Sequence, residues 1–167
     1  VWPLHDEALA KRIKERPDFV KAILNIGKAC KNPRKDYAKY SDVYPAIRFF
    51  FHDEWEKLIS SPLPFKESLS KETLKGMLLS SIDMPYGVDE ATWFAAVKEI
   101  GGKYGFATSN KDYKANPGNY VGSLSDSAEI IRVALTGSNQ SPNLHEVLEI
   151  LCKEEVDARL REVAELL

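Results

Sequence analysis

The spacing of the apolar residues constrains the fold of this chain more than any other feature of its sequence. Over most of the 167 residues, apolar side chains recur every three or four positions, which places them on one face of an α-helix. Trp93, Val97 and Ile100 form one such stripe, and another runs from Val156 to Leu167. No segment shows the strict alternation of apolar and polar residues that is typical of a half-buried strand. The sequence therefore predicts an all-α fold, with no sheet beyond a stray two-stranded bridge.

Serine, aspartate, proline and glycine residues predict where individual helices begin and end. Asp89 can cap the helix that follows it, because its side chain can accept a hydrogen bond from a free N–H group of the first turn. Ser125 is expected to cap a helix that Gly137 ends, since glycine readily adopts the left-handed conformation that stops a helix. Ser141 is expected to cap the next helix, with Pro142 at its first position. These positions predict two helices joined by a short polar loop.

Two polar segments interrupt the helical pattern and indicate how the chain is organised. Residues 60–68 carry two prolines and three serines, a composition typical of a linker. We therefore expect two small helical bundles in tandem, the first over residues 1–67 and the second over residues 68–167. Residues 107–123 are polar, rich in turn-forming residues and without clear periodicity. Because the chain begins with Val1 rather than Met, we expect it to be a piece of a longer protein.

The net charge of −2 argues against a uniformly basic chain, but the charges are unevenly distributed. Between Lys28 and Arg48 there are six bases and two acids, which gives a local charge of +4. Between Glu146 and Leu167 there are seven acids and three bases, which gives −4. The six bases are Lys28, Lys31, Arg34, Lys35, Lys39 and Arg48. This asymmetry is compatible with a polyanion bound to one face, although an ordinary solvated surface is the alternative.

The sequence predicts neither a disulfide, a metal site nor a membrane span. Cys30 and Cys152 lie far apart and neither belongs to a CxxC motif, so we expect two buried thiols in a cytoplasmic protein. The stretch His52-Asp53-Glu54 lacks a second histidine three or four positions later, which argues against metal binding. No apolar run approaches the roughly 20 residues that a membrane-spanning helix needs.

The chain also lacks the motifs that identify common catalytic sites. None of the patterns GxGxxG, GxxxxGK[ST], HExxH or GxSxG occurs, so a nucleotide-binding loop, a zinc-protease helix and a nucleophile elbow are not predicted. Neighbouring carboxylates such as Glu154 and Glu155 lie in a charge-rich helix and indicate a solvated surface. We therefore expect no catalytic residue, and a binding module rather than an enzyme in its own right.

The segment "IIRVALTGSNQSPNLHEVLEILCKEEVDARL" resembles the C-terminal end of bacterial-type glutamyl-tRNA synthetases. That family has an Arg-x-Ala-Leu-Thr-Gly element, here residues 132–137, then a polar loop and a Thr/Ser-Pro-x-Leu element, here residues 141–144. A Leu-Gly-Lys-Glu-like step leads into a final helix with an Arg-Leu pair, here Arg159-Leu160. Upstream, "NPRKDYAKYSDVYPAIRFFF" and "WFAAVKEIGGKYGF" are similar to further segments of the family in the same order. The resemblance implies the all-helical "α-helix cage" with which class I aminoacyl-tRNA synthetases of this kind bind the anticodon.

The resemblance also implies RNA contacts at particular residues. In the family, the arginine of the first motif and residues of the second lie against the first anticodon base. The matching residues here are Arg132, Ser141, Pro142 and Leu144. Another family arginine reads the third anticodon base; its best match is Arg34, with Lys35 and Arg48 as alternatives. The residues implied as contacts to the tRNA backbone, which position RNA without reading its sequence, are Lys28, Lys31, Lys35, Lys39 and Arg48.

Three departures from the family pattern bear on what this chain does. Cys152 stands where glycine is common, so the local turn is expected to differ. The polar segment before the arginine helix, within residues 108–126, is longer than the family's link, and its role is left open. The catalytic motifs of the class I synthetases are missing. The resemblance therefore implies an anticodon-binding region without its catalytic domain.

For the parent protein, the resemblance implies a cytoplasmic, monomeric glutamate–tRNA ligase that uses ATP and Mg to charge tRNA-Glu. It leaves open whether tRNA-Gln is a second substrate. The chain by itself is expected to bind tRNA, to bind no membrane, to need no cofactor or metal, and to be inactive as a ligase.

Simpler alternatives exist for each of these assignments. Arg132 could pair with Glu129, and Leu144 could belong to the core. Ser141 and Pro142 could simply be the start of a helix, without contacting RNA. Arg34 could be a solvent-facing turn residue. For the chain as a whole, the alternative is a helical protein-interaction domain that binds no RNA.

Overall fold

The computed structural model describes residues 7–29 and 37–167. Regular structure in these ranges is helical: they contain no strand, and Phe106 and Gly122 form one isolated parallel bridge. The predicted all-α fold is therefore confirmed. None of the described helices has both the length and the apolar character needed to cross a membrane.

The described residues form ten α-helices and three short 3₁₀-helices. The α-helices are α1 (Glu7–Glu15), α2 (Pro17–Leu24), α3 (Val43–Ile47), α4 (His52–Ile59), α5 (Lys71–Ser81), α6 (Glu90–Lys103), α7 (Asn110–Ala115), α8 (Leu124–Thr136), α9 (Leu144–Leu151) and α10 (Lys153–Leu166). The 3₁₀-helices are η1 (Tyr40–Asp42), η2 (Arg48–Phe50) and η3 (Pro117–Asn119).

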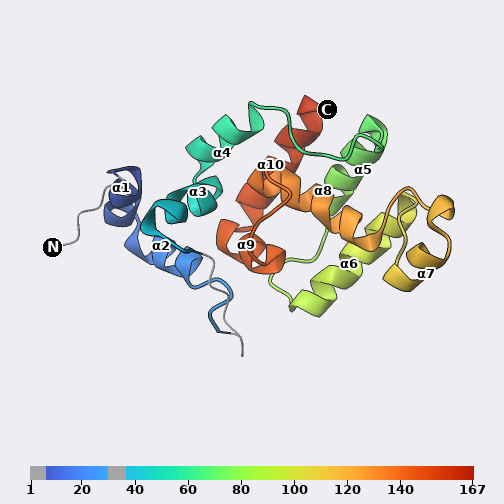
Figure 1. Ribbon diagram of the computed structural model, residues 1–167, viewed down its shortest axis with the longest axis horizontal. Coiled ribbons are helices and arrows are strands. Elements are labelled where there is room, and N and C mark those ends of the chain that lie inside the picture. The colour runs from blue at the N-terminus through green and yellow to red at the C-terminus, as the bar shows by residue number, and fades with distance from the viewer. Residues whose placement is uncertain (1–6, 30–36) are drawn as a thin grey trace.

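Helices α8 and α10 occupy the middle of the molecule and pack against each other and against α5 (Figure 1). Helix α6 packs on α5 and α8, while α1 to α4 lie on the opposite side, where α2 contacts α9. Apolar side chains from both sides belong to one buried cluster, which includes Ile23, Trp55 and Leu135. The division into bundles over residues 1–67 and 68–167 stays a prediction.

Two of the predicted helix ends are confirmed. The Asp89 side chain accepts a hydrogen bond from Thr92 N over 3.0 Å at the start of α6. Gly137 ends α8 in the left-handed conformation, with φ of 71°. In both cases a local property of one residue decided the helix end, as the sequence predicted.

The two other predicted caps were wrong by two residues. Helix α8 is capped by Ser123 rather than Ser125, because Ser123 and Asp126 accept each other's backbone N–H in a capping box. Helix α9 is capped by Asn143 rather than Ser141, because Asn143 Oδ1 accepts from the N–H of residue 146. Pro142 therefore precedes α9 instead of occupying its first position.

The expectation of two buried thiols was also wrong for the one cysteine that the structure describes. Cys152 is exposed in the joint between α9 and α10. The joint consists of this single residue. Cys30 lies outside the described residues.

Candidate nucleic-acid interface

Helix α8 carries Arg132 on the outer side of a largely buried helix. Its neighbours Ile131 and Val133 are fully buried, whereas the Arg132 side chain is partly exposed. Because core packing surrounds α8, the backbone under Arg132 is rigidly supported.

The helix stops sharply at Gly137. Gly137 N donates to Val133 O over 2.8 Å. A Cβ atom at this position would lie 2.9 Å from Leu58 Cβ of α4, so a larger residue could not fit without a shift. The Thr136 hydroxyl then contacts both the carbonyl and the N–H of Ser138, at 3.0 and 3.3 Å. These contacts direct the chain out of α8 along one defined path.

Arg132 reaches across the loop to the residues that precede α9. Its Nη1 donates to Ser141 Oγ over 2.5 Å, and lies 3.3 Å from Ser141 O and 3.1 Å from Pro142 O. The Ser141 hydroxyl in turn donates to Pro142 O over 2.9 Å. Several acceptors on one nitrogen fix the orientation of a planar guanidinium. The structure thus brings three of the predicted first-base residues together.

The start of α9 is anchored to the α6 side of the molecule. Asn143 Nδ2 donates to Glu90 Oε1 over 2.8 Å, and His145 Nε2 lies 2.8 Å from Val88 O. The fourth predicted residue, Leu144, is only 5% exposed and belongs to the core. Its side chain therefore holds the loop in place rather than lying on its surface.

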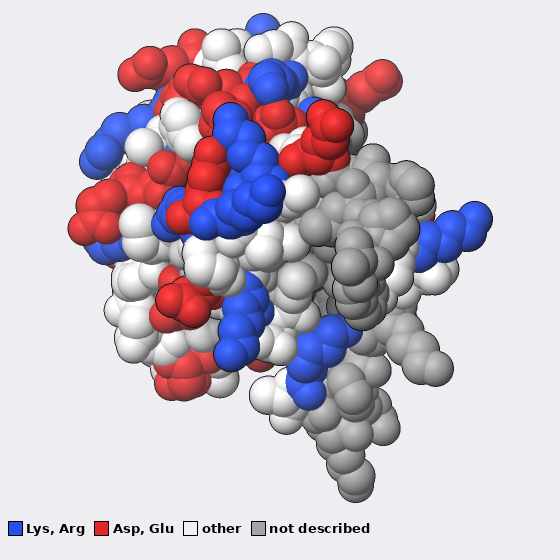
Figure 2. Space-filling view, turned by 90° about the vertical axis from the view of Figure 1, so that its left-hand side faces the viewer, with Lys and Arg blue, Asp and Glu red and all other residues white. Residues whose placement is uncertain are grey.

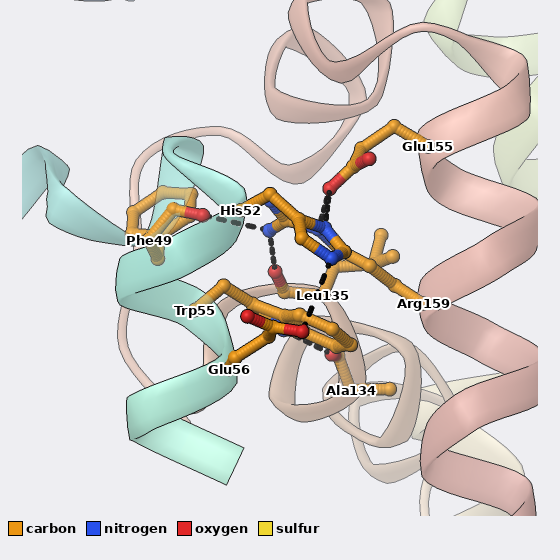
Figure 3. Close-up of polar contacts among 8 residues, drawn as sticks. All are labelled: Phe49, His52, Trp55, Glu56, Ala134, Leu135, Glu155 and Arg159. Carbon is orange, nitrogen blue, oxygen red and sulfur yellow. Dashed lines mark hydrogen bonds and ion pairs between the residues drawn. The ribbon is translucent and has the colours of Figure 1, made fainter.

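A buried arginine that the sequence analysis gave no role holds the last turn of α8, just before the loop (Figure 3). The Arg159 side chain is completely buried, and its Nη1 donates to Leu135 O of α8 and to Phe49 O of η2, both over 2.7 Å. Its Nε donates to Glu155 Oε1 over 2.7 Å, and its guanidinium carbon lies 4.7 Å from the centre of the Trp55 ring. The resemblance had pointed to the Arg-Leu pair, but only the tertiary structure shows what the arginine contacts.

Glu155, which accepts the hydrogen bond from Arg159, also contacts His52 at the surface. His52 Nδ1 lies 2.9 Å from Glu155 Oε1 and its Nε2 lies 3.5 Å from Glu56 Oε1 (Figure 3). The hydrogen bond with Glu155 raises the pKa of His52. Burial acts to raise the pKa of Glu155, but hydrogen bonds from His52 and Arg159 outweigh it and lower that pKa below its ordinary value. In the described part of the chain, no three His, Cys, Asp or Glu residues are grouped so as to hold a metal ion.

Comparison with known proteins agrees with this geometry. The family model of the anticodon binding domain matches residues 123–164, which include the whole of α8, the loop and α9. Glutamate–tRNA ligase of Clostridium perfringens strain 13 is 31% identical over 158 residues, which is 93% of this chain and 29% of that protein. The chain is an anticodon-binding region of the glutamate–tRNA ligase family. The resemblance drawn from the sequence is thus confirmed.

Two further glutamate–tRNA ligases show the same extent of similarity. That of Acetivibrio thermocellus is 28% identical over 94% of this anticodon-binding region, and that of Sorangium cellulosum is 32% identical over 93%. This anticodon-binding region spans 27 to 29% of the length of the relatives that it matches. No solved structure matches it at a significant level.

Residues 28–48, hereafter the basic segment, follow α2 in the anticodon-binding region, and the chain just before them is tied to α9. Gly27 N donates to Glu146 Oε2 over 3.0 Å, which places the beginning of this segment against the first turn of α9. Lys28 comes next, and its Nζ lies 6.0 Å from the centre of the Tyr37 ring. The predicted positions Lys31, Arg34 and Lys35 lie outside the described residues.

Two other predicted backbone contacts differ in their surroundings. Lys39 is exposed, whereas Arg48 Nε lies 3.4 Å from Glu54 Oε2 and is partly neutralised by it. Figure 2 shows the end of the molecule that lies at the left of Figure 1, where basic and acidic side chains are interspersed over the upper part. On this face the positive charge is therefore local rather than continuous.

At the joint between α9 and α10 of the anticodon-binding region, a cysteine has a backbone conformation that is typical of glycine. Cys152 adopts φ of 65° and ψ of 160°, and it is the only described residue other than glycine with a positive φ. This region of φ and ψ is almost restricted to glycine. Cys152 therefore holds a backbone conformation that favours glycine. The expectation that this turn differs from that of the family stays a prediction.

Proposed function

We propose that this chain recognises the anticodon of tRNA-Glu as the anticodon-binding part of a class I glutamate–tRNA ligase. The observation that carries the proposal is the contact of Arg132 with Ser141 and Pro142, inside the segment that matches an anticodon binding domain. A loop of polar groups at the end of a rigid helix suits an unstacked RNA base, which is read on its Watson–Crick edge.

In this proposal Arg132 is the residue that reads the first anticodon base. Ser141 and Pro142 hold its guanidinium, and Leu144 anchors the loop from the core. Arg34 is proposed to read the third base, and Lys28, Lys31, Lys35, Lys39 and Arg48 to contact the tRNA backbone.

The parent protein is proposed to be a cytoplasmic monomer that ligates glutamate to tRNA-Glu with ATP and Mg. Recognition of tRNA-Gln by the same loop stays an open alternative. The chain itself carries no nucleotide-binding motif, so we propose that it neither forms glutamyl-adenylate nor charges tRNA. ATP–pyrophosphate exchange by the purified chain would contradict this part of the proposal.

The decisive experiment is a tRNA titration of the Arg132→Ala variant. We expect affinity for tRNA-Glu to fall by about 1–3 kcal/mol, by analogy with bidentate base contacts in DNA complexes. The variant should also lose preference for tRNA-Glu over a transcript with a changed first anticodon base. Arg161→Ala removes an exposed arginine of α10 and is the matched control, which should bind like the wild type. A folded Arg132→Ala variant with unchanged affinity and unchanged anticodon preference would refute the proposed role.

A further inference from the structure

The C-terminal turn of α8 is held by side chains from two other helices. Trp55 Nε1 of α4 donates to Ala134 O over 3.0 Å, and Arg159 Nη1 of α10 donates to Leu135 O over 2.7 Å. These carbonyls belong to the last turn of the helix, where backbone oxygens lack partners within the helix. Arg132 lies within the same helical turn, so the hydrogen bonds hold the backbone turn that carries it.

The same nitrogen of Arg159 also binds a segment far away in the sequence. Arg159 Nη1 donates to Phe49 O of η2, 110 residues earlier in the chain (Figure 3). Phe49 directly follows Arg48, the last residue of the basic segment. One buried nitrogen thus joins the backbone of the arginine turn in α8 to the backbone at the end of the basic segment.

Arginine suits this position for reasons of geometry and charge. Its guanidinium presents Nε to Glu155 while Nη1 reaches two carbonyls, which the single ammonium of lysine cannot reproduce from one place. The C-terminal end of a helix carries partial negative charge, which favours a cation there. Glu155 supplies a counter-charge, whereas the second terminal nitrogen, Nη2, is buried without a hydrogen-bond partner among the described residues.

From these contacts we infer that Arg159 is a positioning residue for anticodon recognition, and that it sets the placement of Arg132 relative to Arg48. The inference rests on the proposed function, in which both residues contact one tRNA. Arg159 touches no RNA in this mechanism, because its side chain is completely buried. It acts by fixing the two backbones that carry the contacting residues.

The test combines binding with stability on three variants of the whole chain. Arg159→Lys keeps the positive charge but loses the branched guanidinium. Trp55→Phe removes the hydrogen bond to Ala134 O, together with part of the ring that packs on the Arg159 guanidinium. Val163→Ala is the matched control, since Val163 is fully buried on the same helix and belongs to the apolar core. All variants are titrated with tRNA-Glu well below their unfolding midpoints, and again with Arg132→Ala added.

We expect folded Arg159→Lys to bind tRNA-Glu about tenfold more weakly than the wild type, with a smaller loss in Trp55→Phe. The Arg132→Ala substitution should cost less in the Arg159→Lys background than in the wild type, because Arg132 is already misplaced there. Val163→Ala should lose stability and keep its affinity.

Two results would overturn the inference while leaving the proposed function intact. In the first, Arg159→Lys and Trp55→Phe bind as Val163→Ala does. In the second, the fold-losses in tRNA affinity from Arg132→Ala and Arg159→Lys multiply in the double variant, so the two residues act independently. Absence of tRNA binding by the wild-type chain would overturn both the inference and the proposed function.

Discussion

Arg132 and Ser141, nine residues apart, are joined by a hydrogen bond of 2.5 Å across the loop between α8 and α9. The Ser141 hydroxyl accepts from the guanidinium and donates to Pro142 O, so both of its hydrogen-bonding functions serve the loop itself. Ser141 therefore orients Arg132, and its contribution to RNA binding is expected to pass through that residue.

Removing this hydroxyl should weaken binding without unfolding the chain. We expect Ser141→Ala to lower affinity for tRNA-Glu by roughly 1–2 kcal/mol, since a hydrogen bond to a charged partner is lost while the two carbonyl contacts remain. Ser141→Thr retains the hydroxyl and should bind like the wild type. Equal losses in both variants, measured by tRNA titration, would show that the hydroxyl does not matter.

Gly137 should tolerate no side chain. Alanine there needs a left-handed backbone and meets Leu58 Cβ at 2.9 Å, so Gly137→Ala should lower the free energy of unfolding by about 2–4 kcal/mol. Gly87→Ala is the control: Gly87 has a similar φ of 69° but nothing within 4 Å of the added Cβ. Denaturant unfolding should show the smaller loss for Gly87→Ala, about 1–2 kcal/mol. Equal losses would contradict the contact with Leu58.

Cys152 should be a position where glycine stabilises the protein. Its φ and ψ cost a residue with a Cβ about 1–3 kcal/mol. Glycine would remove this cost, but its greater conformational freedom in the unfolded chain offsets part of the gain. We expect Cys152→Gly to raise the free energy of unfolding by about 1 kcal/mol, seen as a higher unfolding midpoint. Cys152→Ala removes the thiol but keeps the Cβ, so it should gain nothing. A gain that is as large for alanine as for glycine would locate the effect in the thiol.

His52 should make the stability of the fold depend on pH. The hydrogen bond with Glu155 raises the pKa of His52 above its ordinary value of 6.5. Protonated His52 therefore favours the folded state; its contribution is complete below pH 6.5 and is lost as pH rises through the folded-state pKa. His52→Gln should flatten the unfolding free energy across that window. Stability that falls with rising pH to the same extent in both proteins would exclude His52 as the cause.

Binding of tRNA should weaken with salt despite the net charge of −2. Each single-stranded phosphate contact contributes a slope of about −0.7 to log K against log salt. Lys39→Ala should therefore reduce the slope by about 0.7, whereas Lys103→Ala, at the end of α6 and paired with Glu99 at 2.9 Å, should leave it unchanged. A slope that is the same in both variants would remove Lys39 from the interface.

The sequence by itself determined the features that depend on neighbouring residues. Helical spacing predicted the all-α fold, and Asp89 and Gly137 marked helix ends because capping and a left-handed φ are properties of single residues. Where several polar residues competed for one helix start, the sequence was ambiguous. Ser123 prevailed over Ser125 through its reciprocal bond with Asp126.

Only the tertiary structure decided how the candidate site is built. The motif identified Arg132 and Ser141 as members of one segment, but their contact depends on the path of the loop past Leu58. The role of Arg159 was undetectable from spacing, because its partners are backbone carbonyls that every residue possesses. Such partners carry no mark in the sequence, and which carbonyl meets the guanidinium is set only when α8, α10 and η2 pack together.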